Sequence, residues 1–95
     1  MKWVSKEVGT RNQLYGVMKY RIVCDFPGFF SIREWCWNQW GPGIEHEHYI
    51  NHQFYTGADP VWCWDAAKFQ GASRKDGQIY LKDDDLLTQF KLAWA

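Results

Sequence analysis

The sequence lacks the features that would assign a function class at once. No apolar run approaches the length of a membrane span, and the first ten residues hold no apolar core of the kind a signal peptide needs. The glycines stand at expected turns rather than in a phosphate-binding loop. Charge of one sign is not in excess, because 11 basic residues face 11 acidic ones. These absences argue against a membrane-spanning protein, a P-loop nucleotide-binding protein and a general nucleic-acid binder.

Cysteine is scarce and unpatterned. Cys24, Cys36 and Cys63 are odd in number, have no C-x-x-C spacing and lie among apolar residues. A disulfide framework needs paired cysteines, and a reactive thiol needs a partly exposed, electropositive setting. We therefore expect buried free thiols in a reducing cytoplasm, with no thiol nucleophile.

Aromatic residues are what the chain has in abundance. They make up 19% of it and include seven tryptophans. Five of these fall in two short stretches, residues 35–40 and 62–64. Large aromatic side chains fill the core of a small domain, and they are also enriched at protein–protein interfaces. Composition leaves both explanations open.

The first part of the chain predicts a strand. Residues 1–16 are polar and mixed, so we expect an N-terminal arm or a short extra strand there, followed by a single domain over 17–95. Residues 17–26 alternate in polarity as a strand does. The apolar parity that should face the core is Met18, Tyr20, Ile22, Cys24 and Phe26. The opposite face should present Val17, Lys19, Arg21 and Val23.

A helix is predicted over residues 32–40. Pro27-Gly28 should break the preceding strand, and Ser31 with Glu34 forms a capping box. Phe30, just before this cap, should pack on Trp35 as a hydrophobic staple.

The sequence also predicts where this helix ends and which of its faces is buried. Gly41 should end it, and Pro42 prevents its continuation. Its inward face should hold Ile32, Trp35, Cys36, Gln39 and Trp40. Trp37 lies off that face, so we expect its ring to be exposed.

The middle of the chain is less clearly patterned. Residues 43–57 alternate and predict a strand that is long or bent near Asn51. Residues 59–71 fit a helix capped by Asp59 or a strand, and the β-rich start favours the strand.

The last part predicts a hairpin, a strand and a helix. Asp76-Gly77 indicates a turn before a strand over 78–82. Asp83 should cap a final helix, although the alternation of the last residues leaves a strand as the alternative. The helical spacing is carried by Leu86, Leu87, Phe90 and Trp94.

This order of elements predicts an α+β fold. A ferredoxin-like sandwich, with two helices on one face of a mostly antiparallel sheet, is the architecture we expect. The other face of that sheet would then be bare unless something covers it.

Part of the chain resembles a known group of proteins. The stretches in question are "KYRIVCDFP", "REWCWNQWGP" and the tail "IYLKDDDLLTQFKLAW", which cover about half of the sequence. They resemble small uncharacterised proteins of tailed bacteriophages, including marine cyanophages. The resemblance implies a phage origin and an α+β fold, and it supplies no catalytic residues.

The histidines are candidate metal ligands. His46 and His48 would point the same way from a strand, about 7 Å apart, and His52 shares their parity. Neutral imidazoles on one face can hold zinc, with Glu45 or Glu47 supporting them. The sequence shows no fourth ligand, so local hydrogen bonding of these histidines is the competing interpretation.

Two further candidates have simpler explanations. The acidic run Asp83-Asp84-Asp85 could bind a cation, but capping and the helix dipole account for it. A single-stranded nucleic acid could stack on Tyr20, Tyr49, Tyr55 and Tyr80, but the basic surplus such binding uses is missing.

Binding to a protein is the function we expect, without enzymatic activity. Tryptophan, tyrosine and arginine dominate the energetics of interfaces. Self-association into a homo-oligomer is the simplest form, and a host or phage protein is the other partner considered. The residues expected to form the patch are Arg33, Trp37, Tyr49, Tyr55 and one or both of Trp62 and Trp64.

Overall fold

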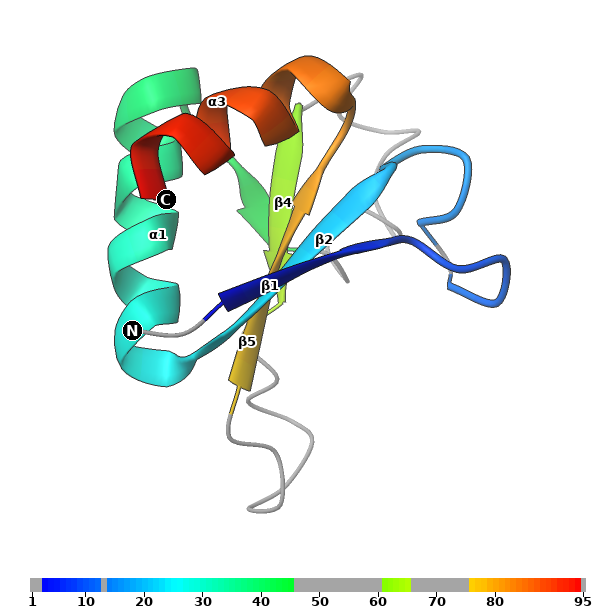
Figure 1. Cartoon of the computed structure of the whole chain (residues 1–95), viewed down its shortest axis with the longest axis horizontal. Helices are drawn as coiled ribbons and strands as arrows, with labels where there is room; N and C mark the ends of the chain where they lie inside the picture. Colours follow the sequence, from blue (N-terminus) through cyan, green and yellow to red (C-terminus); the bar gives the residue numbers. More distant parts are fainter. Residues whose placement is uncertain (1–2, 13, 46–60, 66–75, 95) are drawn as a thin grey trace.

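A computed structural model describes residues 3–12, 14–45, 61–65 and 76–94. Within these residues the strands form one sheet in the order β1-β2-β5-β4-β3, and neighbours are antiparallel except that β3 runs parallel to β4 (Figure 1). The elements in chain order are β1 (Trp3–Glu7), β2 (Tyr20–Asp25), α1 (Phe26–Trp40), β3 (Ile44–Glu45), β4 (Trp62–Asp65), β5 (Asp76–Leu81) and α3 (Asp84–Trp94).

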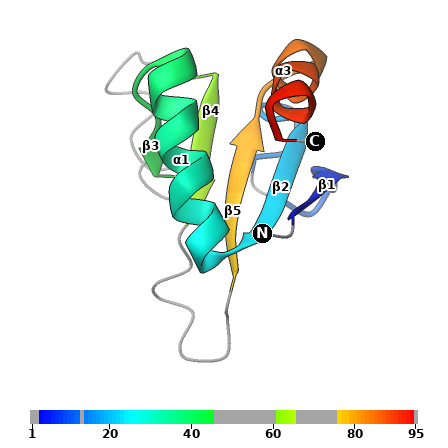
Figure 2. The ribbon, with the colours of Figure 1, turned by 60° about the vertical axis from the view of Figure 1, so that its left-hand side comes forward.

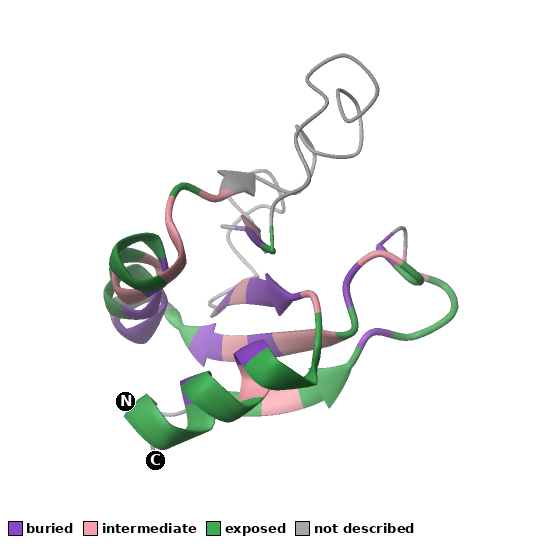
Figure 3. Cartoon of the chain, turned by 90° about the horizontal axis from the view of Figure 1, so that it is seen from above, coloured by how far each residue is buried: buried purple, intermediate pink, exposed green. Residues whose placement is uncertain are grey.

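Both helices pack on the same face of the sheet (Figure 2). The main hydrophobic core lies between them and the strands, and Figure 3 shows its buried residues along the strands and the inner sides of the helices. The expected α+β class is therefore confirmed. This core is formed by Ile22, Cys24, Phe29, Ile32, Cys36, Trp62, Ile79, Leu81, Leu86 and Phe90.

The expected ferredoxin-like strand order is not observed. A ferredoxin-like chain runs β-α-β-β-α-β and closes its sheet with a strand after the second helix. Here the edge beside β2 is occupied by β1, which precedes the first helix. The N-terminal segment takes this place because Trp3 packs against the main core and its indole nitrogen donates to the Trp94 carbonyl oxygen at 3.1 Å.

The alternation predicted for the first long strand is confirmed where the strand forms. Ile22 and Cys24 are buried beneath the helices, and Tyr20 packs beside them. The strand begins at Tyr20 rather than at residue 17, because Val17 and Met18 end a turn in which both backbone amides donate to the Leu14 carbonyl oxygen. Met18 is buried in a different cluster, on the other side of the sheet.

The predicted start of the first helix is wrong. Helix α1 begins at Phe26, and Asp25 is its N-cap because its carboxylate accepts from the Gly28 amide at 2.8 Å. Strand β2 does end before Pro27, but the helix follows at once, since proline is tolerated in the first helical turn, where its missing N–H is not needed. Ser31 lies inside the helix, whereas the predicted end at Trp40, followed by Gly41 with φ 88°, is confirmed.

The second half of the chain matches the prediction in part. Residues 62–65 form a strand, and the final helix is capped by Asp83, which accepts from the Leu86 amide at 3.1 Å. Asp76-Gly77 is not a turn but the start of β5. Gly77 stands there because a Cβ atom would come within 2.4 Å of the Phe29 ring. Most of the strand expected over 43–57 lies outside the described residues, which include only Ile44–Glu45 of it.

The far face of the sheet is not bare throughout. Residues 8–12 and 14–18 bring Val8, Leu14 and Met18 against Tyr80 and Cys63 in a second buried cluster. This segment is held to the sheet by a hydrogen bond from the Asn12 side-chain amide nitrogen to the Tyr80 hydroxyl. The expectation of an uncovered face is wrong here because the N-terminal segment folds back over it. In the described part of the chain, neither helix has the length and apolar character needed to cross a bilayer.

Candidate functional site

Most of the described tryptophans belong to the fold. Trp35 on α1 contacts Trp40, Phe90 and Trp94 edge to face, with ring centres 5.0 to 6.1 Å apart. Trp3 meets Phe90 at 4.8 Å in the same manner. Such contacts join β1, α1 and α3, so these side chains are explained by packing.

The two tryptophans of β4 have different roles. Trp62 is completely buried, and its indole nitrogen donates to the Gly41 carbonyl oxygen at 3.0 Å. Its ring lies so close to Gly43 that a Cβ atom there would come within 2.5 Å. Trp64 is only half-buried and lines an open groove. Trp62 is therefore a core residue, and Trp64 is the one that reaches the surface.

A groove of about 650 Å³ lies between α1 and β4. Four of its lining residues are spaced i, i+3, i+4 and i+7 along α1, which places them on one side of the helix. Phe30 and Trp37 are the large apolar members, with exposed fractions of 52% and 48%. We call this site the α1–β4 groove; its residues are Phe30, Arg33, Glu34, Trp37, Asn38 and Trp64.

Arg33 lies among aromatic rings in this groove. Its guanidinium carbon is 4.9 Å from the centre of the Trp64 ring and 5.3 Å from that of Phe30. Each such cation–π contact stabilises by about 0.5–1 kcal/mol at exposed sites. Among the described residues the guanidinium makes no ion pair or hydrogen bond, so its N–H donors remain available.

Trp64 contributes its ring to the groove. Its indole nitrogen is buried, so a partner cannot reach it, and it has no hydrogen-bond acceptor within the described part of the chain. Trp37 adds a half-exposed ring whose centre lies 6.5 Å from that of Trp62, with the two rings nearly perpendicular. The groove thus combines half-exposed aromatic rings with the N–H donors of Arg33, an arrangement suited to a partner that brings both an apolar group and an acceptor.

The predicted patch residues divide into three groups. Arg33, Trp37 and Trp64 come together in the α1–β4 groove, and Trp62 lies beneath it. Tyr49 and Tyr55 lie outside the described residues. Phe30 was missed because the sequence assigns it to a staple, although it follows the true cap by five residues and faces outward.

The candidate metal ligands His46, His48 and His52 also lie outside the described residues. Within the part that the structure describes, no group of three or more histidine, cysteine or acidic side chains is arranged to hold a metal ion.

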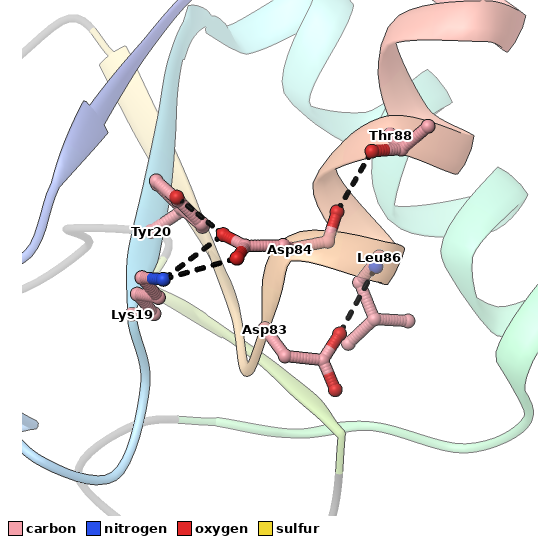
Figure 4. A network of polar contacts seen from close by, with 6 residues as sticks. All are labelled: Lys19, Tyr20, Asp83, Asp84, Leu86 and Thr88. Atoms are coloured by element: carbon pink, nitrogen blue, oxygen red, sulfur yellow. Dashed lines mark hydrogen bonds and ion pairs between the residues drawn. The ribbon is translucent and has the colours of Figure 1, made fainter.

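The acidic run is engaged in local contacts (Figure 4). Asp83 caps α3, and Asp84 accepts from the Tyr20 hydroxyl and pairs with the Lys19 ammonium at 3.0 Å. The Tyr20 hydrogen bond, with help from Lys19, lowers the pKa of Asp84 below its usual value. The Asp84 hydrogen bond raises the pKa of Lys19 and that of Tyr20. These contacts give Asp83 and Asp84 structural roles.

The thiols are placed as the sequence indicates. Cys24, Cys36 and Cys63 are buried and are not joined by disulfide bonds. Burial raises the pKa of Cys36 far above its usual value, with a smaller contribution from Cys24. A thiolate nucleophile is disfavoured in such a setting.

Two of the tyrosines considered for base stacking, Tyr20 and Tyr80, are among the described residues, and both are engaged in contacts within the chain. Tyr80 is buried in the far-face cluster, and its hydroxyl donates to Gln78 at 3.0 Å. The hydroxyl of Tyr20 is occupied by Asp84. Neither arrangement provides the open aromatic platform that single-stranded nucleic acids use.

No protein-family model, curated protein or solved structure matches this chain.

Proposed function

We propose that this protein acts by binding another polypeptide through the α1–β4 groove. The observation that carries the proposal is the Arg33 guanidinium, which lies between aromatic rings without an ion pair in the described residues and beside the exposed ring of Trp37. Arginine and tryptophan in such settings are the residues that dominate binding energy at interfaces.

The magnitudes support this assignment. A tryptophan buries about 150–250 Å² when fully covered, and about half of the Trp37 ring is open. Covering about 100 Å² of apolar surface contributes about 2.5 kcal/mol. A hydrogen bond to a charged group adds about 1.5–3 kcal/mol when its partner is well placed. Trp37 and Arg33 can therefore act together as the centre of a binding site.

A peptide-display experiment tests this function. A random peptide library is panned on the purified protein, and the affinities of enriched peptides are measured for the native chain, Trp37→Ala, Arg33→Ala and the control Leu92→Ala. Leu92 is exposed on α3, away from the groove. We expect a loss of about 10-fold or more for the two groove variants and none for the control. Equal affinities across all four proteins would contradict the proposal.

The setting that we propose is a bacterial cell infected by a phage. It rests on the three stretches that resemble phage proteins. Mass spectrometry of infected cells, fractionated into cytoplasm and envelope, tests it.

A further inference from the structure

The lining of the α1–β4 groove is symmetric in a way that points to its occupant. Phe30 and Trp37 are equally distant along the helix from the midpoint between Arg33 and Glu34. We propose that the occupant is a second copy of this chain, with the two α1 helices packed antiparallel about that midpoint. This inference rests on the proposed function and deepens it by naming the partner.

The charges of the groove are complementary to themselves under a two-fold rotation. Arg33 and Glu34 are adjacent, and neighbouring helical residues do not face each other. Neither side chain has an ion-pair partner within the described residues. In a symmetric dimer the same patch meets itself. Two-fold symmetry then places Arg33 opposite Glu34 of the partner subunit, and each chain supplies what the other lacks.

The aromatic residues follow the same symmetry. Trp37 follows Phe30 by seven positions on the helix, which corresponds to about 10.5 Å along the axis. In the antiparallel arrangement Phe30 lies opposite Trp37 of the partner subunit, and the reverse contact forms at the other end. The two charge pairs then lie at the centre, flanked by two aromatic contacts of the kind that favours edge-to-face or offset packing.

The charges also exclude the parallel arrangement. Two parallel α1 helices would place Arg33 against Arg33 and Glu34 against Glu34 of the partner subunit. Like charges across an interface are strongly unfavourable. Asn38 is the remaining polar residue of the groove and is uncharged, so the orientation depends on the central pair.

Charge-reversal variants test the second copy directly. Dimer dissociation constants are measured by sedimentation equilibrium for the native chain, Arg33→Glu, Glu34→Arg and the double variant Arg33→Glu/Glu34→Arg. Lys91→Glu is the matched control, because it reverses an exposed charge on α3. Far-UV circular dichroism checks that each variant is folded, and any variant that fails is replaced by Arg33→Gln or Glu34→Gln.

The expected result is specific to this geometry. The native chain and Lys91→Glu form dimers of equal affinity, and each single reversal weakens the dimer about 10-fold or more. The double variant recovers native affinity to within about threefold, because opposite charges again meet. A mixture of the two single variants forms a heterodimer, since one carries two acidic and the other two basic residues at these positions.

Two outcomes would contradict the proposal that the partner is a second copy of this chain. One is a native chain that stays monomeric at 100-fold the concentration at which it binds the enriched peptides. The other is a dimer that is insensitive to all four charge states, as pairing through the edge of β1 would be. If the chain is monomeric but Trp37-dependent peptide binding persists, the proposed function stands without the dimer. If the chain neither dimerises nor binds peptides through Trp37, the proposed function and the proposed dimer both fail.

Discussion

The guanidinium of Arg33 lies 4.9 Å from the centre of the Trp64 ring, which links the outer side of helix α1 to strand β4. Two residues 31 positions apart thus form one surface, and Phe30 and Trp37 extend it along the helix. Among the described residues the guanidinium makes no ion pair or hydrogen bond, so its N–H donors stay available to a partner.

The Arg33 contacts should matter more for binding than for folding. Arg33→Gln should lower the free energy of unfolding by about 0.5–1 kcal/mol, because cation–π contacts are lost while the core stays intact. Urea denaturation measures this, with Arg11→Gln as the control at an exposed arginine. A loss as large as that of a core deletion, about 3 kcal/mol, would show that Arg33 is a structural residue instead.

The cap of α1 gives a second prediction. Asp25→Ala should destabilise the protein by about 1 kcal/mol, because the Gly28 amide loses its acceptor. Asp25→Asn keeps an acceptor oxygen and should cost much less. Equal losses for the two variants would show that the charge of Asp25, rather than its capping hydrogen bond, is what matters.

The start of helix α1 could not be predicted from the local sequence. Ser31 and Glu34 match the capping-box pattern, and Pro27-Gly28 matches the end of a strand. These local signals all predict that the helix starts late, at residue 32. The helix nevertheless begins at Phe26, because Asp25 caps it and the added turn buries Phe29 in the core. Only the tertiary contact decides between the two starts.

Other parts of the fold could be predicted from the local sequence. The inward parity of Ile22 and Cys24 and the cap at Asp83 follow from spacing alone, and both are confirmed. Strand order does not follow in this way, because the place of β1 depends on the contact of Trp3 with Phe90 and Trp94. Residues more than 80 positions apart determine that contact.

The candidate site, like the fold, could be predicted only in part. Helical spacing separates Trp37 from the core face, and the structure shows it half exposed. Trp62 and Trp64 are two residues apart on β4 and therefore share one face of the sheet, so the sequence does not decide which of them reaches the surface. Both point toward the helix layer, and only the position of α1 leaves Trp64 at the groove.

The close approach of β5 to α1 gives a third prediction. Gly77→Ala should destabilise the protein by about 1–3 kcal/mol, because the new methyl group overlaps the Phe29 ring. Gly9→Ala is the matched control, since nothing lies within 4 Å of its added Cβ atom. Combining Gly77→Ala with Phe29→Leu should cost less than the sum of the two single changes. Strict additivity would contradict the overlap.

The Asp84 network gives a fourth prediction, on pH. The pKa of Asp84 is lowered in the folded protein, so its contribution to stability is complete above the usual 3.8 and is lost as pH falls through the lowered folded value. The native chain should therefore lose more stability than Asp84→Asn as the solution is acidified below this value. Chemical denaturation at a series of pH values tests this, and parallel curves for the two proteins would contradict it.

The measurement that tests the binding surface most directly is ¹⁹F NMR of the protein labelled with 5-fluorotryptophan. The resonance of Trp37 is identified by its loss in Trp37→Phe, and those of Trp64 and Trp94 in the same way. As the chain is concentrated, or as an enriched peptide is added, the resonances of Trp37 and Trp64 should shift while that of Trp94 stays in place. Association with an unchanged Trp37 resonance would show that the α1–β4 groove is not the surface that binds.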